Sequence, residues 1–315
     1  MRIATVPDAE WIERVGPVEG VEVRSWDMST PLPDPEIGYA VHPYLTSPAR
    51  VANVGSVPGH RVVQLMTAGY DAHLAHLHAD VSLCNAAGVH DAATAEQAVT
   101  LMLAALRGIP EFVQAQARAT WLPIRMWSGL ADKRVLIVGY GRIGRAIAAR
   151  LAPFEVSLTA VASRPRAGDD LVPVVHGMDE WPTLLPHADV VVLVVPLLPA
   201  TTGLVDADFL AAMPAGSLLV NIARGPVVDT DALLAALHSG RIRAALDVTD
   251  PEPLPDGHPL WTAPDVLISP HVGGASNAFY PRAAALIRTQ LQRYAVGQPP
   301  LHIVAGPSAD RSTGR

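Results

Sequence analysis

The spacing of apolar residues differs between the ends of the chain and its central part. Between residues 134 and 272, continuous apolar runs alternate with helical patterns. Continuous runs, rather than alternating ones, are typical of strands covered on both faces of a parallel sheet. Strands separated by helices in this way predict a doubly wound α/β domain. The runs are RVLIVG, VSLTAVA, DVVVLVVP, SLLVNIA, RAALDV and VLISPHV.

The two ends of the chain predict a second domain. Before residue 90, short strand-like runs alternate with Pro- and Gly-containing segments, and a long helical pattern, AATAEQAVTLMLAALRGI, follows. Another helical pattern begins near residue 277, and we expect it to pack back on the first domain. Residues 1–92 and 277–305 are therefore predicted to form one discontinuous domain, residues 93–276 another, and the polar segment 306–315 a disordered tail.

Composition narrows the class of protein. The 315 residues are 50% hydrophobic and 17% charged, which suits large folded cores. The net charge of −7 and the absence of a Lys/Arg run argue against a nucleic-acid partner. The longest apolar run, VVVLVVPLLPA, is interrupted by proline and is too short to span a bilayer. With early acidic residues and a single cysteine, Cys84, the chain is predicted to be soluble and cytoplasmic, with no membrane partner.

A glycine motif marks the start of the central domain. In VLIVGYGRIGRAIAARL, Gly139, Gly141 and Gly144 follow a predicted strand and open a predicted helix. In such a G-x-G-x-x-G loop, glycines permit the tight turn, the approach of a pyrophosphate and close helix–strand packing. Backbone N–H groups near Arg142 and Ile143 are then expected to meet the phosphates. We interpret the loop as dinucleotide-binding rather than as an ordinary tight turn.

The end of the next strand bears on the choice of dinucleotide. An acidic residue usually lies there and accepts hydrogen bonds from the adenosine ribose. The sequence AVASRPR places Ala162 at that position, followed by Ser163, Arg164 and Arg166. Two guanidinium groups without a carboxylate favour a 2′-phosphate, and hence NADP(H) over NAD(H). The alternative is that both arginines are ordinary surface charges.

Polar residues also follow three later strands, at the sheet end where ligands collect. They are Arg224 in NIARGPVVD, Asp247 and Glu252 in ALDVTDPEPLP, and His271 in SPHVGGAS. Together with TAGYD, GVHDAATAEQAV and VPLLPATTGLV, these segments resemble, in order, those of the D-isomer-specific 2-hydroxyacid dehydrogenases, over nearly the whole chain. The resemblance implies a Rossmann-type cofactor domain and a smaller flavodoxin-like α/β substrate domain.

The resemblance also implies roles for individual residues. His271 would be the general acid/base, Glu252 would hydrogen-bond it and hold it charged, and Arg224 would bind the carboxylate and carbonyl oxygen of the substrate. A histidine is chemically suited to this role, because reducing a keto acid requires a proton donor at the developing alkoxide. Asp247 would contact the nicotinamide carboxamide. Further implied cofactor contacts are Val195, Pro196, Thr201, Ile222, Ala223, His271, Gly273 and Gly274; implied substrate contacts are Ala68, Gly69, Tyr70 and His90.

We therefore predict an NADP-preferring reductase of small 2-keto acids such as glyoxylate or hydroxypyruvate, forming a homodimer. Formate oxidation is disfavoured because Glu252 stands where the formate enzymes of this superfamily have glutamine, and phosphite oxidation because Ala68 stands where the phosphite enzymes have lysine. Two alternatives stay open: an NAD-dependent dehydrogenase, and a non-catalytic dinucleotide sensor of the corepressor type.

One further cluster suggests a metal site but does not complete one. His73, His76 and His78 lie close together in DAHLAHLHAD, and no fourth ligand is evident downstream. The sequence is interpreted as having no metal site.

Overall fold

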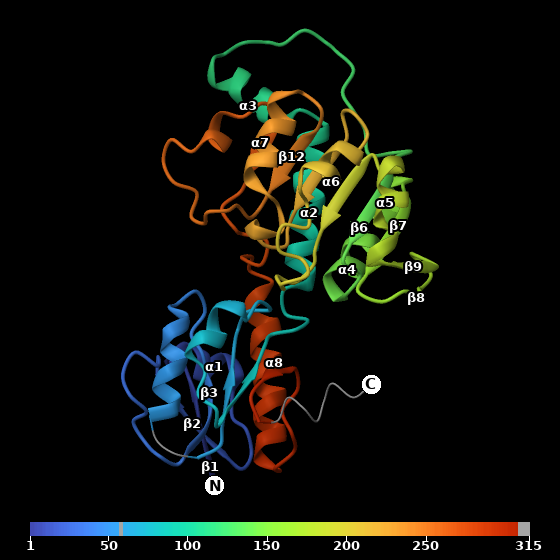
Figure 1. The fold of residues 1–315 in the computed structure, drawn as a ribbon. Helices are drawn as coiled ribbons and strands as arrows, with labels where there is room; N and C mark the ends of the chain where they lie inside the picture. The colour runs from blue at the N-terminus through green and yellow to red at the C-terminus, as the bar shows by residue number, and fades with distance from the viewer. Residues whose placement is uncertain (57–58, 308–315) are drawn as a thin grey trace. The chain divides into compact units, whose positions relative to one another are not determined.

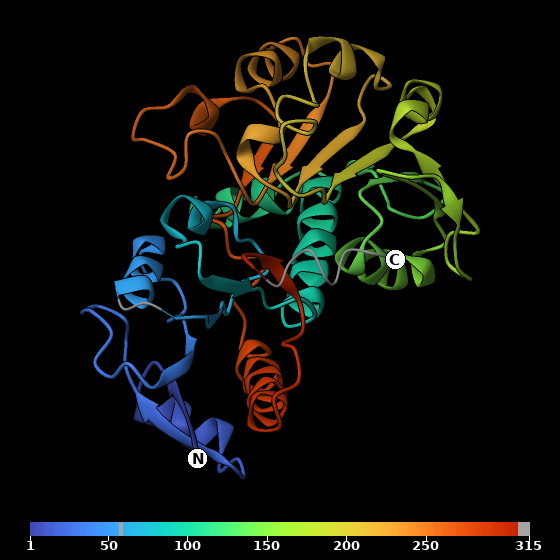
Figure 2. The same cartoon turned by 60° about the horizontal axis from the view of Figure 1, so that its bottom comes forward.

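The computed structural model describes residues 1–56 and 59–307, which fold as two compact units. One unit contains Met1–His90 together with the segment that begins at Asn277, and the other contains Asp91–Ser276. Helix α8 (Phe279–Ala295), red in Figures 1 and 2, thus belongs with the blue N-terminal strands despite its position in the sequence. The first boundary lies two residues before the predicted position at 92. Most of the predicted tail, residues 308–315, lies outside the described residues.

The larger unit is built on a sheet with strand order β13-β12-β11-β10-β6-β7-β9-β8. All neighbouring strands are parallel except the β8–β9 pair at one edge. The chain runs outward from β6 in one direction and from β10 in the other, which is the doubly wound Rossmann arrangement. The strands are β6 (Arg134–Val138), β7 (Ser157–Ala162), β8 (Arg166–Ala167), β9 (Val174–Gly177), β10 (Val190–Leu193), β11 (Leu218–Asn221), β12 (Arg243–Leu246) and β13 (Val266–Ile268).

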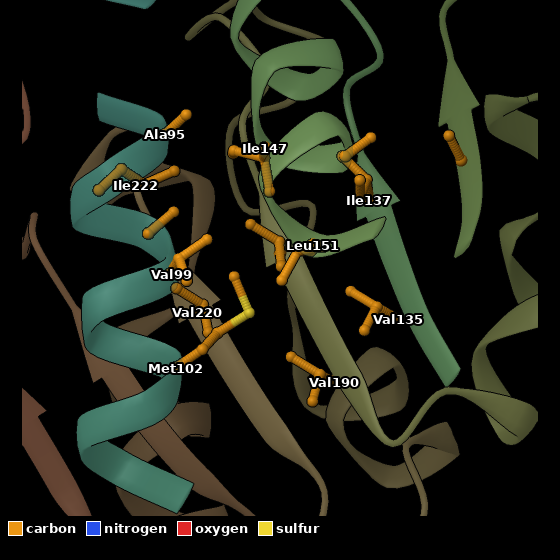
Figure 3. Close-up of a cluster of buried hydrophobic side chains, with 14 of the residues drawn as sticks. Ala95, Val99, Met102, Val135, Ile137, Ile147, Leu151, Val190, Val220 and Ile222 are labelled. Atoms are coloured by element: carbon orange, nitrogen blue, oxygen red, sulfur yellow. The ribbon is translucent and has the colours of Figure 1, made fainter. Parts of the chain in front are cut away.

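Helices cover both faces of this sheet. Figure 3 shows α2 and α4 directing Val99, Met102, Ile147 and Leu151 toward side chains of the central strands. A second apolar cluster fills the opposite face beneath α6 and α7. The six predicted strands are therefore confirmed; β10 and β11 are buried throughout, β6 and β12 except at their first residue, β7 only in its second half, and β13 is half-buried. The helices are α2 (Asp91–Leu106), α3 (Ile109–Ala117), α4 (Arg142–Leu151), α5 (Trp181–Leu184), α6 (Ala207–Ala212) and α7 (Thr230–His238).

The smaller unit has the strand order β14-β5-β4-β3-β1-β2. The first five strands in the chain are parallel in the flavodoxin-like order, and β14 adds to β5 in the antiparallel direction. Helices α1 and α8 pack together on one face. The elements are β1 (Arg2–Val6), α1 (Ala9–Val15), β2 (Val21–Ser25), β3 (Ile37–Val41), β4 (Arg61–Gln64), β5 (Val81–Cys84), α8 and β14 (Ile303–Ala305), with 3₁₀ turns at Pro48–Ser56 and Asp71–His76.

Several elements differ from the sequence prediction. Strands β5, β8, β9 and β14 were not predicted, since each has at most four residues and no periodic pattern. The long helical pattern after residue 91 divides into α2 and α3, which are bent by 67°. Within the described part of the chain, no single helix is long and apolar enough to cross a membrane, although this bent pair meets the criteria of length and composition. Most of the apolar side of α2 is buried in its own unit's core.

Candidate active site

The polar segments predicted in the larger unit all follow the carboxyl ends of neighbouring parallel strands. The glycine loop follows β6, the arginine-containing segment follows β7, and Arg224, Asp247 and His271 follow β11, β12 and β13. In an open parallel sheet, ligands bind outside these ends, at the point where the strand order reverses. That point lies between β6 and β10.

The glycine loop has the backbone geometry that a pyrophosphate site requires. Gly139 has φ +109°, and a Cβ there would lie 2.7 Å from the Val194 carbonyl oxygen. A Cβ at Gly144 would lie 2.1 Å from the Gly139 carbonyl oxygen, so only glycine allows α4 to approach β6 this closely. A Cβ at Gly141 meets nothing within 4 Å, which leaves open space at the N-terminus of α4. The residues present therefore fit a dinucleotide, whose phosphates the first N–H groups of α4, at Arg142 and Ile143, would hold.

The segment after β7 presents arginine rather than carboxylate at the ribose position. Ala162 is buried, whereas Ser163, Arg164 and Arg166 are exposed. The Arg166 Nη2 group donates to the Tyr140 carbonyl oxygen at 2.5 Å, which joins this segment to the glycine loop. The side chain of Arg142 is paired with Asp91 at 3.0 Å.

A carboxylate that the sequence did not point to lies beside this segment. Asp169 accepts hydrogen bonds from the Tyr140 hydroxyl at 3.0 Å and from Arg145 Nε at 2.7 Å. It also accepts from the backbone N–H groups of Leu171 and Val172. Burial raises the pKa of Asp169, but these hydrogen bonds outweigh it and bring the pKa to about 2. Asp169 is thus an ionised anchor for Arg145. Only the three-dimensional contacts mark it, because its sequence neighbourhood has no motif.

His271 and Glu252 lie together although 19 residues separate them. The His271 Nδ1 atom is 2.5 Å from Glu252 Oε1, and both side chains are about two-fifths exposed. The backbone of His271 is in the left-handed region with φ 52°, and its N–H donates to the Asp247 carbonyl oxygen at 2.8 Å. Because Glu252 occupies Nδ1, the other ring nitrogen, Nε2, is the atom that can exchange a proton with a ligand.

Arg224 is held at the start of the next loop by two residues that the sequence analysis did not select. The buried Asn221 side chain donates to the Arg224 carbonyl oxygen at 3.1 Å and accepts from the Ala223 N–H at 3.0 Å. At Gly225, an added Cβ would lie 1.8 Å from the Thr249 carbonyl oxygen. This glycine therefore lets the Arg224 loop contact the loop that carries Glu252.

Asp247 is a buried anchor for the His271 loop. Its carboxylate accepts from Ser269 Oγ at 2.6 Å and from the N–H groups of Val272 at 3.0 Å and Gly273 at 2.8 Å. Three of its acceptor positions are thus already used within the protein. The nicotinamide contact predicted for it stays a prediction, and the observed role is to fix the turn around His271.

The predicted substrate-binding residues other than Arg224 belong to the smaller unit. The half-buried loop Ala68–Tyr70 follows β4, and Asn85 Nδ2 donates to the Ala68 carbonyl oxygen at 2.8 Å. His90 is buried, with Nε2 2.8 Å from the Met66 carbonyl oxygen and its ring stacked near Phe279. Its observed contacts thus fix the segment that leads into this loop.

The remaining predicted cofactor residues lie in the loops after β10, β11 and β13. Thr201 is buried and its hydroxyl donates to the Pro196 carbonyl oxygen at 2.6 Å. The others in these loops are Val195, Ile222, Ala223 and Gly274. In the described ranges, no group of three or more His, Cys, Asp or Glu side chains could hold a metal ion; of the three clustered histidines, His73 is buried and His76 exposed.

The architecture and the glycine loop are those of a dinucleotide-binding protein, and comparison with known proteins gives its family. Residues 99–273 match the model of the D-isomer specific 2-hydroxyacid dehydrogenase NAD-binding domain. The chain is 34% identical to the glyoxylate reductase/hydroxypyruvate reductase of Homo sapiens over 275 residues, 81% of this chain and 82% of the relative. It is also 34% identical to the glyoxylate reductase of Thermofilum pendens, over 79% of this chain and 76% of the relative.

A solved structure of similar fold supports the same assignment. It is a D-isomer specific 2-hydroxyacid dehydrogenase from Xanthobacter autotrophicus Py2 in complex with NADPH and MES, with 30% identity and a TM-score of 0.79. The match covers 96% of this chain and 98% of that chain. The protein belongs to the D-isomer-specific 2-hydroxyacid dehydrogenases. It is an NAD(P)-dependent enzyme of that family.

Proposed function

We propose that the enzyme reduces small 2-keto acids, such as glyoxylate or hydroxypyruvate, to D-2-hydroxy acids with NADPH as the preferred reductant. The observation that carries the reaction is the His271–Glu252 pair, at 2.5 Å; Glu252 comes from the loop adjacent to that of Arg224, and His271 from the loop after that. The relatives named glyoxylate reductase support the substrate class, which stays a proposal for this chain.

In this proposal His271 donates the proton. When bound, the nicotinamide cofactor would supply the hydride for the keto carbon, and the carbonyl oxygen of the substrate requires a proton. His271 gives it from Nε2, while Glu252 at Nδ1 stabilises the protonated ring and fixes its orientation. Arg224 pairs with the planar carboxylate of the substrate through its guanidinium group. In the reverse direction, neutral His271 accepts the proton of the hydroxyl group.

The cofactor preference rests on the segment after β7. Buried Ala162 removes the carboxylate that would repel a 2′-phosphate, and the exposed Arg164 and Arg166 supply guanidinium groups. Asp169, a carboxylate beside this region, is itself paired with Arg145 at 2.7 Å. The NADPH complex of the Xanthobacter relative is consistent with this preference.

Initial rates test both the substrate class and the cofactor preference. They are measured with glyoxylate, hydroxypyruvate, pyruvate and phenylpyruvate, each with NADPH and with NADH. We expect turnover to favour NADPH, and Arg164→Ala to raise the KM for NADPH by about tenfold, the loss of one charge-assisted contact. The KM for NADH is expected to stay within a factor of about two in that variant. A preference for NADH throughout would overturn the cofactor proposal. Absence of turnover combined with tight cofactor binding would favour the alternative of a dinucleotide sensor.

We also propose that the enzyme forms a homodimer through α3 and the segment that follows it. Trp121, Ile124 and Met126 are 94%, 99% and 96% exposed, and Val113 of α3 is 59% exposed. Figure 1 shows this green segment arching away from the rest of its unit. Large apolar side chains grouped in this way mark an interaction surface. Sedimentation of wild type and Ile124→Lys tests it: a monomeric wild type would overturn the proposal. A cytoplasmic location stays a prediction from the sequence.

A further inference from the structure

A cavity in the smaller unit is lined by none of the residues placed in the catalytic site. It has a volume of about 460 Å³ and lies between the second half of α8, the segment 297–300 and the sheet. Its strand residues are near the amino ends of β1, β3 and β4, whereas the Ala68–Tyr70 loop follows the carboxyl end of β4. A volume in this range is typical of small-molecule sites. We propose that this cavity is a regulatory site for an aromatic monocarboxylate.

The hydrogen-bond donors in the floor of the cavity are already engaged. Tyr39, Val62 and Gln290 are 1%, 6% and 1% exposed. The Tyr39 hydroxyl already donates to Gln64 Oε1 at 3.1 Å. Gln290 Nε2 donates to Gln64 Oε1 at 2.7 Å and to the Leu301 carbonyl oxygen at 2.9 Å, and Gln290 Oε1 accepts from the Leu301 N–H. With these donors engaged, the floor favours an apolar body on the ligand.

The walls favour a flat ring. Tyr294 projects into the space that a side chain at position 38 would fill, because a Cβ on Gly38 would lie 2.2 Å from the Tyr294 hydroxyl oxygen. Its ring is tilted against that of Tyr39, with centroids 5.6 Å apart. Pro299 and Pro300 also line the cavity. Aromatic and proline surfaces of this kind bind planar rings through large contact area.

The rim supplies positive charge. Arg2 lies with its guanidinium carbon 5.0 Å from the centroid of the Tyr294 ring, and the exposed imidazole of His60 also lines the cavity. No Asp or Glu is among the described lining residues. A cation without a neighbouring carboxylate in the same wall favours an anion at the mouth, so the ring would point inward and the carboxylate outward to Arg2.

A chain of hydrogen bonds joins the floor to the predicted substrate loop. Gln64, which receives Tyr39 and Gln290, donates from Nε2 to the Asn85 carbonyl oxygen at 3.0 Å. Asn85 Nδ2 in turn donates to the Ala68 carbonyl oxygen at 2.8 Å. A ligand that contacts Tyr39 and Gln290 can therefore alter the loop Ala68–Tyr70 by shifting the side chains of Gln64 and Asn85, which lie between them in this chain of hydrogen bonds. This regulatory part rests on the proposed function, whereas binding does not.

Calorimetric titration of the full chain with 2-naphthoate tests binding directly. We expect 2-naphthoate to bind at least about tenfold more tightly than the neutral 2-naphthamide, because only the acid can pair with Arg2. Arg2→Gln should remove that difference, while Arg282→Gln, an exposed arginine elsewhere on α8, should keep it. Gln298→Trp, which places an indole at the rim, should abolish binding, and Gln292→Trp, exposed on α8 away from the cavity, should not.

The outcomes separate this cavity from the catalytic site. Equal affinities for the acid and the amide would overturn the proposal, as would binding that survives Gln298→Trp. Binding that Arg224→Gln abolishes would assign the ligand to the catalytic site and also overturn it. With bound 2-naphthoate we expect the KM for the keto acid to change by about threefold or more at constant kcat, and not in Gln298→Trp. An unchanged KM would overturn the regulatory part, whereas failure to turn over any keto acid would overturn the proposed function and leave binding intact.

Discussion

In the larger unit, the polar side chains of the His271–Glu252 pair are about two-fifths exposed at the carboxyl edge of the sheet. In the smaller unit, the polar side chains Gln64, Gln290 and His42 are 0%, 1% and 3% exposed. The first group can meet a ligand, while the second group satisfies its hydrogen bonds inside the protein. Burial separates the two groups: the partly exposed pair is available for the proposed chemistry, whereas the buried side chains order the protein interior.

The largest effect is expected from His271→Asn. Loss of a general acid/base lowers kcat by about 10²–10⁴-fold. The unfolding free energy should change by less than about 1 kcal/mol, because the pair with Glu252 is partly exposed. Stopped-flow reduction and urea unfolding measure the two quantities, with the Kd for NADPH as the control. If the variant unfolds easily and retains its kcat, His271 contributes to stability rather than to catalysis, which would contradict the proposed role of the partly exposed pair.

One contribution to the pH dependence of stability, between pH 6.5 and pH 4, should come from His42 in the smaller unit. Burial, and repulsion from His73, lower the pKa of His42 from 6.5 to about 4. The unfolded chain then binds the proton more readily than the folded chain. The contribution of neutral, buried His42 to the free energy of unfolding is therefore complete above pH 6.5 and is lost as the pH falls toward 4. The loss amounts to about 3 kcal/mol by pH 4.

Urea unfolding of wild type and His42→Gln between pH 7 and pH 4 measures this contribution. Glutamine has no titrating group and can still donate to the Ser47 carbonyl oxygen, which lies 3.3 Å from His42 Nε2. We expect the variant to lose less free energy on acidification than wild type. Parallel curves for the two proteins would show that His42 is not the titrating group.

A smaller effect is expected from Gly225→Ala, which tests whether close backbone packing positions the exposed pair. The new Cβ would lie 1.8 Å from the Thr249 carbonyl oxygen, so the loop that carries Glu252 must shift. The expected loss is about 1–3 kcal/mol of unfolding free energy, with a fall in kcat. Gly129→Ala is the matched control, because its Cβ meets only the Ala131 backbone nitrogen, at 4.0 Å. Unchanged kcat in both variants would mean that the Glu252 loop tolerates the shift.

The sequence predicts the larger unit better than the smaller one for a physical reason. Gly139, Gly141 and Gly144 are close in sequence, and the strand ends of a parallel sheet lie at one edge. The glycine spacing and the apolar strand pattern together therefore predict the glycine loop and the loops of Arg224 and His271. Asp169 could not be predicted in the same way, because its partners Tyr140 and Arg145 come from the glycine loop and from α4, 29 and 24 positions away. The Gln64–Gln290 contact joins residues 226 positions apart, and neither lies in a motif. Long-range packing of this kind leaves no local pattern to recognise.

Because the smaller unit is discontinuous in sequence, it can be completed only after the larger unit has been synthesised. The segments that build this unit are separated by Asp91–Ser276, which has its own core and can fold while later residues are still being added. Translation of those 276 − 90 = 186 residues takes on the order of 10–40 s at about 5–20 residues per second. Throughout that time the first five strands lack α8, and the side chains that α8 will cover, among them Val6 and Tyr39, stay exposed to water. A nascent chain halted before residue 277 would therefore carry a fully synthesised larger unit, preceded by an incomplete sheet with exposed apolar side chains. Chaperones are suited to bind such a surface.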